Sequence, residues 1–488
     1  MVYSTRTVGT LLLVIITVAI VVGFYGPTLA TLGTLIFSVV LIFGSVFVPV
    51  KPAALWLLAL GLGGLGLVYG NYSGQEFNLR LGRLSEVITS YQWTGRVVSP
   101  AIEQEFGQLE FVIKTKSGLV SIQSRSGLKP QLGEIIIVEG DTRPPGRDQA
   151  GYARYLVRQG VSAVVRAKSV EPVRQESLGL GDYLILTRET LRKSLISAVP
   201  GRAGELVAGM AFGGETVRDE SLLKAMNITG TRHLVAISGF NIGIIGAGAM
   251  GLLFLMGLKR RWATLGALGL IGIYVLVTGL SASSVRAAIM GGLLLLALSR
   301  GFGTQILRLL ALAGGVMILL APGIAEDVGF QLSFAAVGGI VLLTPVIQSA
   351  LKRIAPNWLA EALAVVVAAQ GAVAPLLWYH FGSVSATSLV YNFLLLPLVP
   401  LSTILAIFTS GLGLISSTLA QILALPLAAI VNLMTDLIFW GSRFPALINI
   451  STGNGLLVVV IYAALIYLGL GQRSRELAMR RERHRYAQ

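Results

Sequence analysis

The sequence of 488 residues contains no cysteine, only three histidines and few charged side chains, 12% in all. Without cysteine the chain forms neither disulfides nor thiolate metal sites. The histidines, His233, His380 and His484, are scattered and cannot build a dinuclear hydrolase site. The motifs G-x-x-x-x-G-K-[ST] and H-E-x-x-H are also missing. The sequence therefore predicts no ATPase or nuclease centre, no bound metal and no cofactor.

Apolar residues make up 54% of the chain, and the mean hydropathy is +0.77. This balance is not that of a soluble domain. Many apolar runs reach the roughly 20 residues that a helix needs to cross about 30 Å of hydrocarbon. We therefore expect a polytopic α-helical membrane protein with about 12 spans, near 8–26, 29–48, 53–70, 234–257, 262–280, 283–299, 306–321, 329–347, 360–379, 386–408, 412–438 and 455–471. Pro426 is a point at which the run 412–438 can split into two shorter helices.

The net charge of +15 is concentrated in short segments beside these runs. The tail at 473–488 is rich in arginine, and the loops 258–262 and 351–356 are basic. Because basic loops stay on the cytoplasmic side, this pattern places both termini in the cytoplasm and the protein in the cell inner membrane. The first group of spans, 1–72, then leaves the following polar region outside the cytoplasm.

This polar region begins with a β-rich segment at 86–172. Its short alternating pieces are bounded by glycine, serine or proline, and one helical piece, "AGYARYLVRQG", interrupts them. Five strands with one helix predict an extracytoplasmic OB-like β-barrel domain. Between Glu86 and Glu171 there are 11 basic against 9 acidic residues, so this domain is not a strong electrostatic attractor for DNA.

The segment 180–228 has an amphipathic helical pattern. Two interpretations remain open: helices that lie on the membrane surface or over a pore mouth, and a soluble helical connector. The apolar pattern then resumes and defines a transmembrane domain at 229–472, which contains four polar sequence motifs.

The first motif is "HLVAISGFNIG" (233–243). Ser238 and Asn241 are three residues apart and share a helix face, whereas Gly239, Gly243 and Gly246 fall on a neighbouring arc. Such glycines allow another helix to approach closely, which is a purely structural use. Because an asparagine in lipid needs a partner or water, the polar arc indicates either contact with another helix or a hydrated path.

Three later motifs add further polar side chains. "GLSASSVRAAIM" carries Ser284 and Arg286, although an arginine at a helix start can also extend to the interface. "GFQLSFAAVGG" carries Gln331 and Ser333, which point to opposite sides of a helix. The fourth motif, "HFGSVSATSLVYNFLLLPLVP", carries His380 and Asn392, beside aromatic rings that could equally form an interfacial belt.

The order of these four motifs resembles that of the ComEC family of competence proteins, over about residues 50–450. The resemblance implies an inner-membrane channel that imports single-stranded DNA during natural transformation. It assigns the channel lining to the motif positions His233, Ser238, Gly239, Ser284, Arg286, Phe330, Gln331, Ser333, His380 and Asn392, to which we add Asn241. That last residue is a departure, because relatives commonly have a second histidine there.

A second departure is that many relatives end in a metallo-β-lactamase-like domain, whereas this chain ends in its basic tail. Degradation of the other strand then requires a separate nuclease. Moving each net charge into a negative interior costs about 2.3 kcal/mol per 100 mV, so a cytoplasmic helicase-type ATPase must drive transport. An extracytoplasmic DNA receptor would deliver the substrate. The tail is a docking element for the motor or, alternatively, a contact for anionic membrane lipid.

Two other classes of protein remain possible from the sequence. A secondary transporter or flippase of another anionic substrate would also use broken, glycine-rich helices. A receptor that only anchors the OB-like domain would not need polar residues in several spans, as this chain has.

Overall fold

The computed structural model describes residues 69–467, apart from short gaps of which the longest are 144–152, 300–305 and 450–456. The chain forms two compact units, Met1–Thr187 with Gly314–Asp327, and Arg188–Ala313 with Val328–Gln488. We call them the barrel unit and the helical unit. The predicted spans 8–26 and 29–48, nearly all of 53–70, the residue Ser238 and the tail 473–488 lie outside the described residues.

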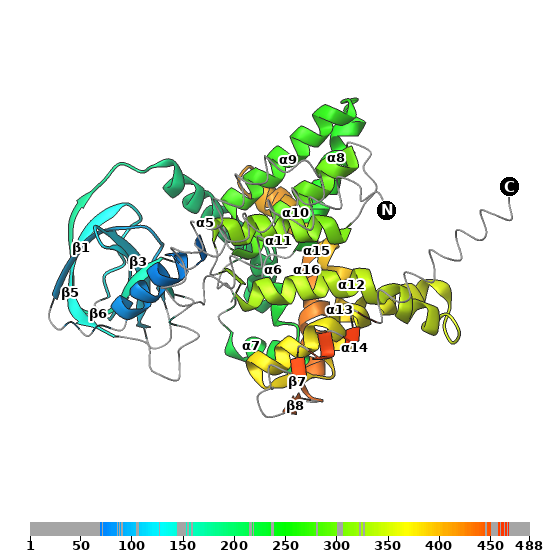
Figure 1. The fold of residues 1–488 in the computed structure, drawn as a ribbon. Helices are drawn as coiled ribbons and strands as arrows, with labels where there is room; N and C mark the ends of the chain where they lie inside the picture. The colour runs from blue at the N-terminus through cyan, green and yellow to red at the C-terminus, as the bar shows by residue number, and fades with distance from the viewer. Residues whose placement is uncertain are drawn as a thin grey trace, which may run out of the picture. The chain divides into compact units, whose positions relative to one another are not determined.

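The barrel unit contains a closed barrel of five strands, with a two-residue strand at its edge (Figure 1). The strands are β1 (Tyr91–Val97), β2 (Ile102–Glu103), β3 (Leu109–Thr115), β4 (Gly118–Ser124), β5 (Glu134–Thr142) and β6 (Val161–Gln175). Their order is β1-β5-β6-β4-β3, and pairing of β1 with β3 closes the ring. β4 and β6 are parallel, and the other neighbours are antiparallel. The arrangement is consistent with the OB-like domain predicted for 86–172.

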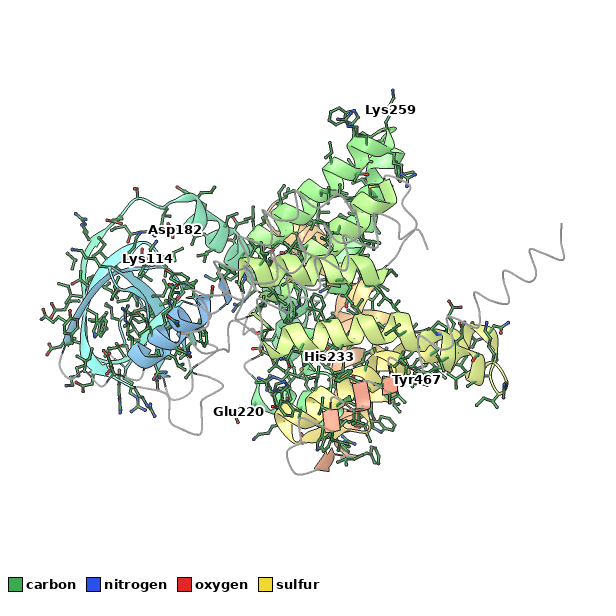
Figure 2. The ribbon with its side chains drawn as sticks, in the orientation of Figure 1. Lys114, Asp182, Glu220, His233, Lys259 and Tyr467 are labelled. Carbon is green, nitrogen blue, oxygen red and sulfur yellow. The ribbon has the colours of Figure 1, made fainter. Side chains whose placement is uncertain are left out.

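Alternating apolar residues point into this barrel, as the strand pattern predicts. Phe111, Ile113 and Ile122 are fully buried there together with Val120 and Ile136. Three of the basic side chains on the outside are paired with carboxylates: Lys129 with Glu103, Lys168 with Asp141 and Arg96 with Asp182. Hydrogen bonding by Arg96 lowers the pKa of the Asp182 carboxyl, which Figure 2 labels at the start of the next helix. This pairing agrees with the nearly balanced charge of the domain.

The rest of the described chain is almost entirely helical. Its helices are α5 (Leu180–Ala198), α6 (Gly201–Phe212), α7 (Glu220–Thr229), α8 (Gly239–Leu255), α9 (Arg260–Val277), α10 (Ala282–Ser299), α11 (Ile306–Leu320), α12 (Val328–Leu351), α13 (Asn357–Phe381), α14 (Ser388–Leu395), α15 (Leu398–Gly413) and α16 (Ser417–Ser442), with the 3₁₀ turn η4 (Arg232–Val235). Two short strands, β7 (Ser383–Ser385) and β8 (Leu447–Asn449), pair antiparallel.

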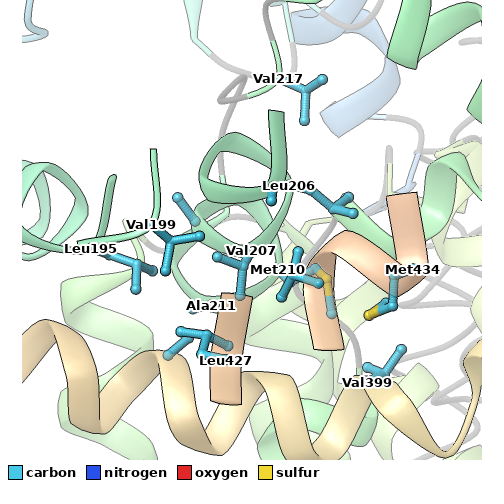
Figure 3. Close-up of a cluster of buried hydrophobic side chains, with 14 of the residues drawn as sticks. Leu195, Val199, Leu206, Val207, Met210, Ala211, Val217, Val399, Leu427 and Met434 are labelled. Carbon is cyan, nitrogen blue, oxygen red and sulfur yellow. The ribbon is translucent and has the colours of Figure 1, made fainter. Parts of the chain in front are cut away.

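The helix α6 lies inside the apolar core of the helical unit. Nine of its residues are buried, from Ala203 to Phe212, and they pack with side chains of α5, α7, α14, α15 and α16. Figure 3 shows Val207 and Met210 of α6 among this cluster, with Leu427 of α16 and Val399 of α15. The amphipathic pattern of the segment 180–228 therefore includes one helix that is enclosed by others.

The number of spans predicted from the sequence, about 12, is not confirmed. The described residues contain four helices long and apolar enough to cross a membrane, α9, α12, α13 and α16, or five spans when α14 and α15 are counted as one broken span. Shorter apolar stretches, Asn241–Leu255, Ser284–Leu296 and Leu309–Leu320, lie in α8, α10 and α11.

The position of the helix break also differs from the sequence pattern. α16 continues through Pro426 without a break, whereas the predicted span 386–408 is divided into α14 and α15, which meet at an angle of 49°. The break falls at Leu396 and Pro397. Pro397 cannot donate a backbone hydrogen bond, and Pro400 follows three residues later, so two donors are missing from the start of α15.

The first turn of α7 provides a prediction about stability and pH. Asp219 caps this helix: its Oδ1 accepts the Leu222 amide at 2.9 Å and the Ser221 hydroxyl, and its Oδ2 accepts Nε–H of Arg202. These hydrogen bonds lower the pKa of Asp219 to about 2 from 3.8. A lowered carboxyl pKa stabilises the fold fully above the ordinary value, and the stabilisation is lost as the pH falls from about 4 to about 2.

We expect Asp219→Ala to lower the apparent Tm of the detergent-purified protein at neutral pH, because it removes the roughly 0.5–2 kcal/mol of stability that a capping residue provides. Asp219→Asn retains a capping oxygen but cannot titrate. The Tm difference between wild type and Asp219→Asn should be constant above about pH 5 and shrink on acidification. A difference that does not depend on pH would contradict this assignment.

Candidate functional site

The end of α6 is the meeting point of three polar side chains from other helices. Asn241 of α8 donates from Nδ2 to the carbonyl of Met210 at 2.9 Å. Tyr274 of α9 donates from its hydroxyl to the carbonyl of Ala211 at 2.6 Å. Arg188 of α5 donates from Nη2 to the carbonyl of Gly213 at 3.2 Å. The bonds thus come from three helices that are separate in the sequence.

The sequence of α6 explains why these carbonyls need partners. The helix ends at Phe212, and Gly213 has a positive φ of 66°, a conformation that glycine adopts without strain. The last carbonyls of a helix have no amide partner within it. In an apolar core an unpaired carbonyl is costly, so side chains from neighbouring helices supply the donors.

Arg188 also contacts the second sequence motif. A Cβ atom built on Gly279 would lie 2.7 Å from Arg188 Nη1, and Gly279 has a φ of +91°. The positive φ favours glycine there, and a larger residue would also displace the end of the Arg188 side chain. A cation beside the C-terminal end of a helix is favourable because that end carries partial negative charge. Burial lowers the pKa of the Arg188 guanidinium from its ordinary value.

The first and second motifs are packed together through α8 and α10. A Cβ on Gly239 would lie 4.0 Å from the Cβ of Ala287, and Ile242 and Ala287 belong to one buried cluster. Ser284 is 0% exposed and Arg286 is 7% exposed. Within the glycine arc, a Cβ added at Gly246 would lie 3.1 Å from Ile271 and 3.3 Å from Leu295, which is the close helix approach expected of such residues.

The chain just before the first motif contacts the fourth motif. Gly230, which ends α7, lies against Ser388, because an added Cβ would be 2.6 Å from the serine Cβ. The Ser385 hydroxyl donates to the Ile228 carbonyl at 2.6 Å. His233 lies in η4, exposed, with its Nδ1 3.2 Å from the Gly230 carbonyl oxygen. Figure 2 labels His233 in this region, on the chain that follows α7.

The third and fourth motifs are joined by a side-chain hydrogen bond. His380 Nε2 and Gln331 Oε1 are 2.7 Å apart, linking α13 to α12. The rings of Phe330 and Phe334 stack at 4.3 Å on α12, and the Tyr379 ring meets the His380 ring edge-on at 5.0 Å. In Figure 1 the helices α12 and α13 lie side by side, in agreement with their close packing.

The remaining predicted residues lie in the same helices. Ser333 is half-buried on α12, and Gly239 is exposed at the start of α8. Asn392 is half-buried on α14, where its Oδ1 is buried with no hydrogen-bond partner in the described part of the protein. Ser238 is outside the described residues. The structure therefore joins motif one to motif two, places the end of α7 against motif four, and pairs Gln331 with His380.

The sequence alone did not identify Tyr274 or Arg188 as part of this site. Tyr274 reads as one aromatic residue within an apolar span, and Arg188 as a charge on the polar side of an amphipathic helix. Their partners are backbone carbonyls, which leave no side-chain pattern in a sequence. In the sequence, the glycines at 213 and 279 mark the two backbone positions near Arg188 that have a positive φ in the structure. Among the residues that the structure describes, no group of three His, Cys, Asp or Glu side chains is arranged to hold a metal ion.

The fold and the site together define a class: a membrane protein in which polar side chains are enclosed between apolar helices, with an OB-like barrel in the same chain. The family model described as Competence protein matches residues 210–475, more than half of the chain. The protein belongs to this competence family, the ComEC family.

A curated relative is similar to the chain over part of its length. The "ComE operon protein 3" of Bacillus subtilis (strain 168) is 27% identical over 252 residues, which are 50% of this chain and 31% of the relative. The similarity therefore covers about a third of that longer protein. No solved structure matches the chain.

Proposed function

We propose that this protein forms the channel through which single-stranded DNA crosses the cytoplasmic membrane during natural transformation. One observation carries the proposal: the match to the competence family spans residues 210–475, and this stretch contains every polar residue that the sequence assigned to a DNA path. The buried Arg286, Ser284 and Asn241 support it. Enclosing polar groups between apolar helices costs free energy, and polar residues in membrane segments usually serve a function.

The chemistry of the side chains suits a strand that must keep moving. A path for single-stranded DNA needs water, hydrogen-bond donors, some aromatic surface and a few cations. Each phosphate contact adds affinity, so a stripe of cations would trap the strand. One arginine with several neutral donors, such as Asn241 and Gln331, provides weak and repeated contacts.

The proposal includes partners and a location. The protein lies in the cell inner membrane with both termini in the cytoplasm, and it is not itself an enzyme. A cytoplasmic helicase-type ATPase supplies the work of moving a polyanion against the membrane potential. An extracytoplasmic receptor delivers the DNA, a separate nuclease degrades the other strand, and the basic tail contacts the motor or anionic lipid.

The test is transformation of cells that lack the protein. With marker DNA added outside, we expect nuclease-resistant DNA in the cytoplasm and transformants to fall to background in the null strain. A plasmid copy of the wild-type gene should restore both. Normal transformation of the null strain would contradict the proposed function.

A second candidate is a secondary transporter or flippase of another anionic substrate. The observation that favours it is the broken pair α14 and α15, since transporters place binding sites at interrupted helices. In that case the null strain would transform normally and would instead fail to exchange a small anion or a lipid-linked substrate.

A further inference from the structure

The helix α6 is built as a separable piece within the helical unit. It has 12 residues, about 18 Å, and is too short to cross roughly 30 Å of hydrocarbon. Gly201 and Gly213 border it with positive φ angles of 77° and 66°. Glycines at both ends can take up the backbone rotation that a moving helix requires.

The contacts along α6 differ in kind from those at its end. Its sides pack by apolar contact, for instance Leu206, Val207 and Met210, all 0% exposed. Its C-terminal end is instead held by three hydrogen bonds. Two of them come from Asn241 and Tyr274, which are uncharged and belong to α8 and α9, and the third comes from the charged Arg188. An uncharged side-chain bond has a small net free energy, so such bonds can be exchanged for bonds to water or to a substrate.

The burial of the polar residues indicates a closed state. Asn241 is 1% exposed, Ser284 is 0% exposed and Arg286 is 7% exposed. A path that carries a hydrated strand needs these side chains in contact with water. Since the carbonyl end of α6 occupies the donor group of Asn241, displacement of this end would free that donor for the strand.

We propose that Asn241 and Tyr274 are positioning residues that latch the C-terminal end of α6 in a closed position, and that this end moves away when the path opens. The inference rests on the proposed channel function and adds its closing element. Arg188 holds the same end through Gly213 and, by its contact with Gly279, ties it to the turn that precedes α10.

The absence of cysteine from the chain allows a direct test. Ala211→Cys places a single thiol at the latched end of α6, where the alanine is 0% exposed. The full-length protein, reconstituted in vesicles, is treated with a water-soluble methanethiosulfonate reagent. We expect slow labelling in this parent, and labelling about 2- to 10-fold faster after Tyr274→Phe or Asn241→Leu, the factor that one uncharged hydrogen bond controls.

Two controls separate a latch from general loosening. Tyr462→Phe removes a similar bond, from the tyrosine hydroxyl to the Ala372 carbonyl at 2.6 Å, and should leave the labelling of Ala211→Cys unchanged. Ala364→Cys, also 0% exposed but on α13 and outside the cluster that surrounds α6, should stay unlabelled in every background. Equal labelling of Ala211→Cys with and without Tyr274→Phe and Asn241→Leu would overturn the latch, as would an equal rise at Ala364→Cys.

The two proposals fail in different ways. Because labelling is measured on purified protein without DNA, it reports the latch alone. Normal transformation of the null strain would contradict the channel while leaving the labelling result valid. If the null strain fails to transform but the labelling rate of Ala211→Cys is the same in all variants, the latch is contradicted and the channel proposal stands. Tyr274→Phe removes a single hydroxyl, and Asn241→Leu on a different helix provides the second, independent variant.

Discussion

Replacing Arg286 by alanine is expected to reduce DNA uptake at least tenfold while the protein remains inserted in the membrane. Arg286 is 7% exposed and lies on α10 next to Ala287, which contacts the first motif. Hydrogen bonds to a charged group are worth about 1.5–3 kcal/mol, and about 1.4 kcal/mol corresponds to a factor of ten. Uptake of labelled DNA into the cytoplasm of the complemented null strain measures the effect.

The matched control is an arginine that is exposed. Arg261 is exposed in the first turn of α9, with its guanidinium 5.8 Å from the centre of the Trp262 ring. The null strain complemented with Arg261→Ala should take up DNA as the strain with the wild-type protein does. If Arg286→Ala, inserted in normal amount, also supports normal uptake, this arginine has no part in the path. Gln331→Ala tests the third motif in the same assay.

The second large effect is expected at Gly339, where α12 and α13 come closest. A Cβ added there would lie 2.2 Å from the Cβ of Ala372 and 2.8 Å from the Ala368 carbonyl oxygen. The helices must therefore separate to accept even a methyl group. Overpacking of this kind costs about 1–3 kcal/mol, so the apparent Tm of Gly339→Ala should fall by roughly 2–12 °C.

The neighbouring glycine provides the comparison. At Gly338 an added Cβ would meet its nearest neighbour, Leu310 Cδ2, at 3.9 Å, which is ordinary contact. Gly338→Ala should therefore leave the Tm of the detergent-purified protein within about a degree or two of wild type. Equal Tm values for Gly338→Ala and Gly339→Ala would show that the two helices do not pack as closely as described. Because Gln331 and His380 lie on these helices, Gly339→Ala should also disturb their hydrogen bond.

Local patterns in the sequence predict the barrel well. The segment "GEIIIVEGD" alternates buried and partly exposed residues, and it forms β5 (Glu134–Thr142). Its pairing partner β6 extends three residues beyond the predicted domain end at 172, to Gln175. Alternation and turn glycines are local signals, so they predict strands without information about the rest of the chain.

The helical unit is predicted less completely, for physical reasons. In an apolar environment the burial of a helix no longer follows from hydropathy, so α6 could not be distinguished from a surface helix. Pro426 is accommodated within α16, whereas Pro397 coincides with a break between α14 and α15. The sequence alone does not show which of the two prolines interrupts a helix. Side chains that bond backbone carbonyls, as Tyr274 does, are visible only when the helices are placed together.

The motifs indicate the family, but they do not predict the contacts that their individual residues make. Asn241, one of the polar residues of the first motif, donates a hydrogen bond to α6 and is buried rather than exposed to solvent. His380 and Gln331, 49 positions apart in the sequence, are direct partners. Whether each residue contacts DNA stays a prediction, and the Arg286 and Gln331 variants address it.

The most direct test of the channel is to follow each strand of a duplex separately. Transforming DNA is labelled on one strand or on the other, and nuclease-resistant label is then measured in the cytoplasm of wild-type and null cells. The channel predicts that, for each DNA molecule taken up by wild-type cells, one strand enters and its complement stays outside, so the cytoplasmic label is single-stranded, and that no label enters null cells. Entry of intact duplex, or equal entry of label into null cells, would contradict it.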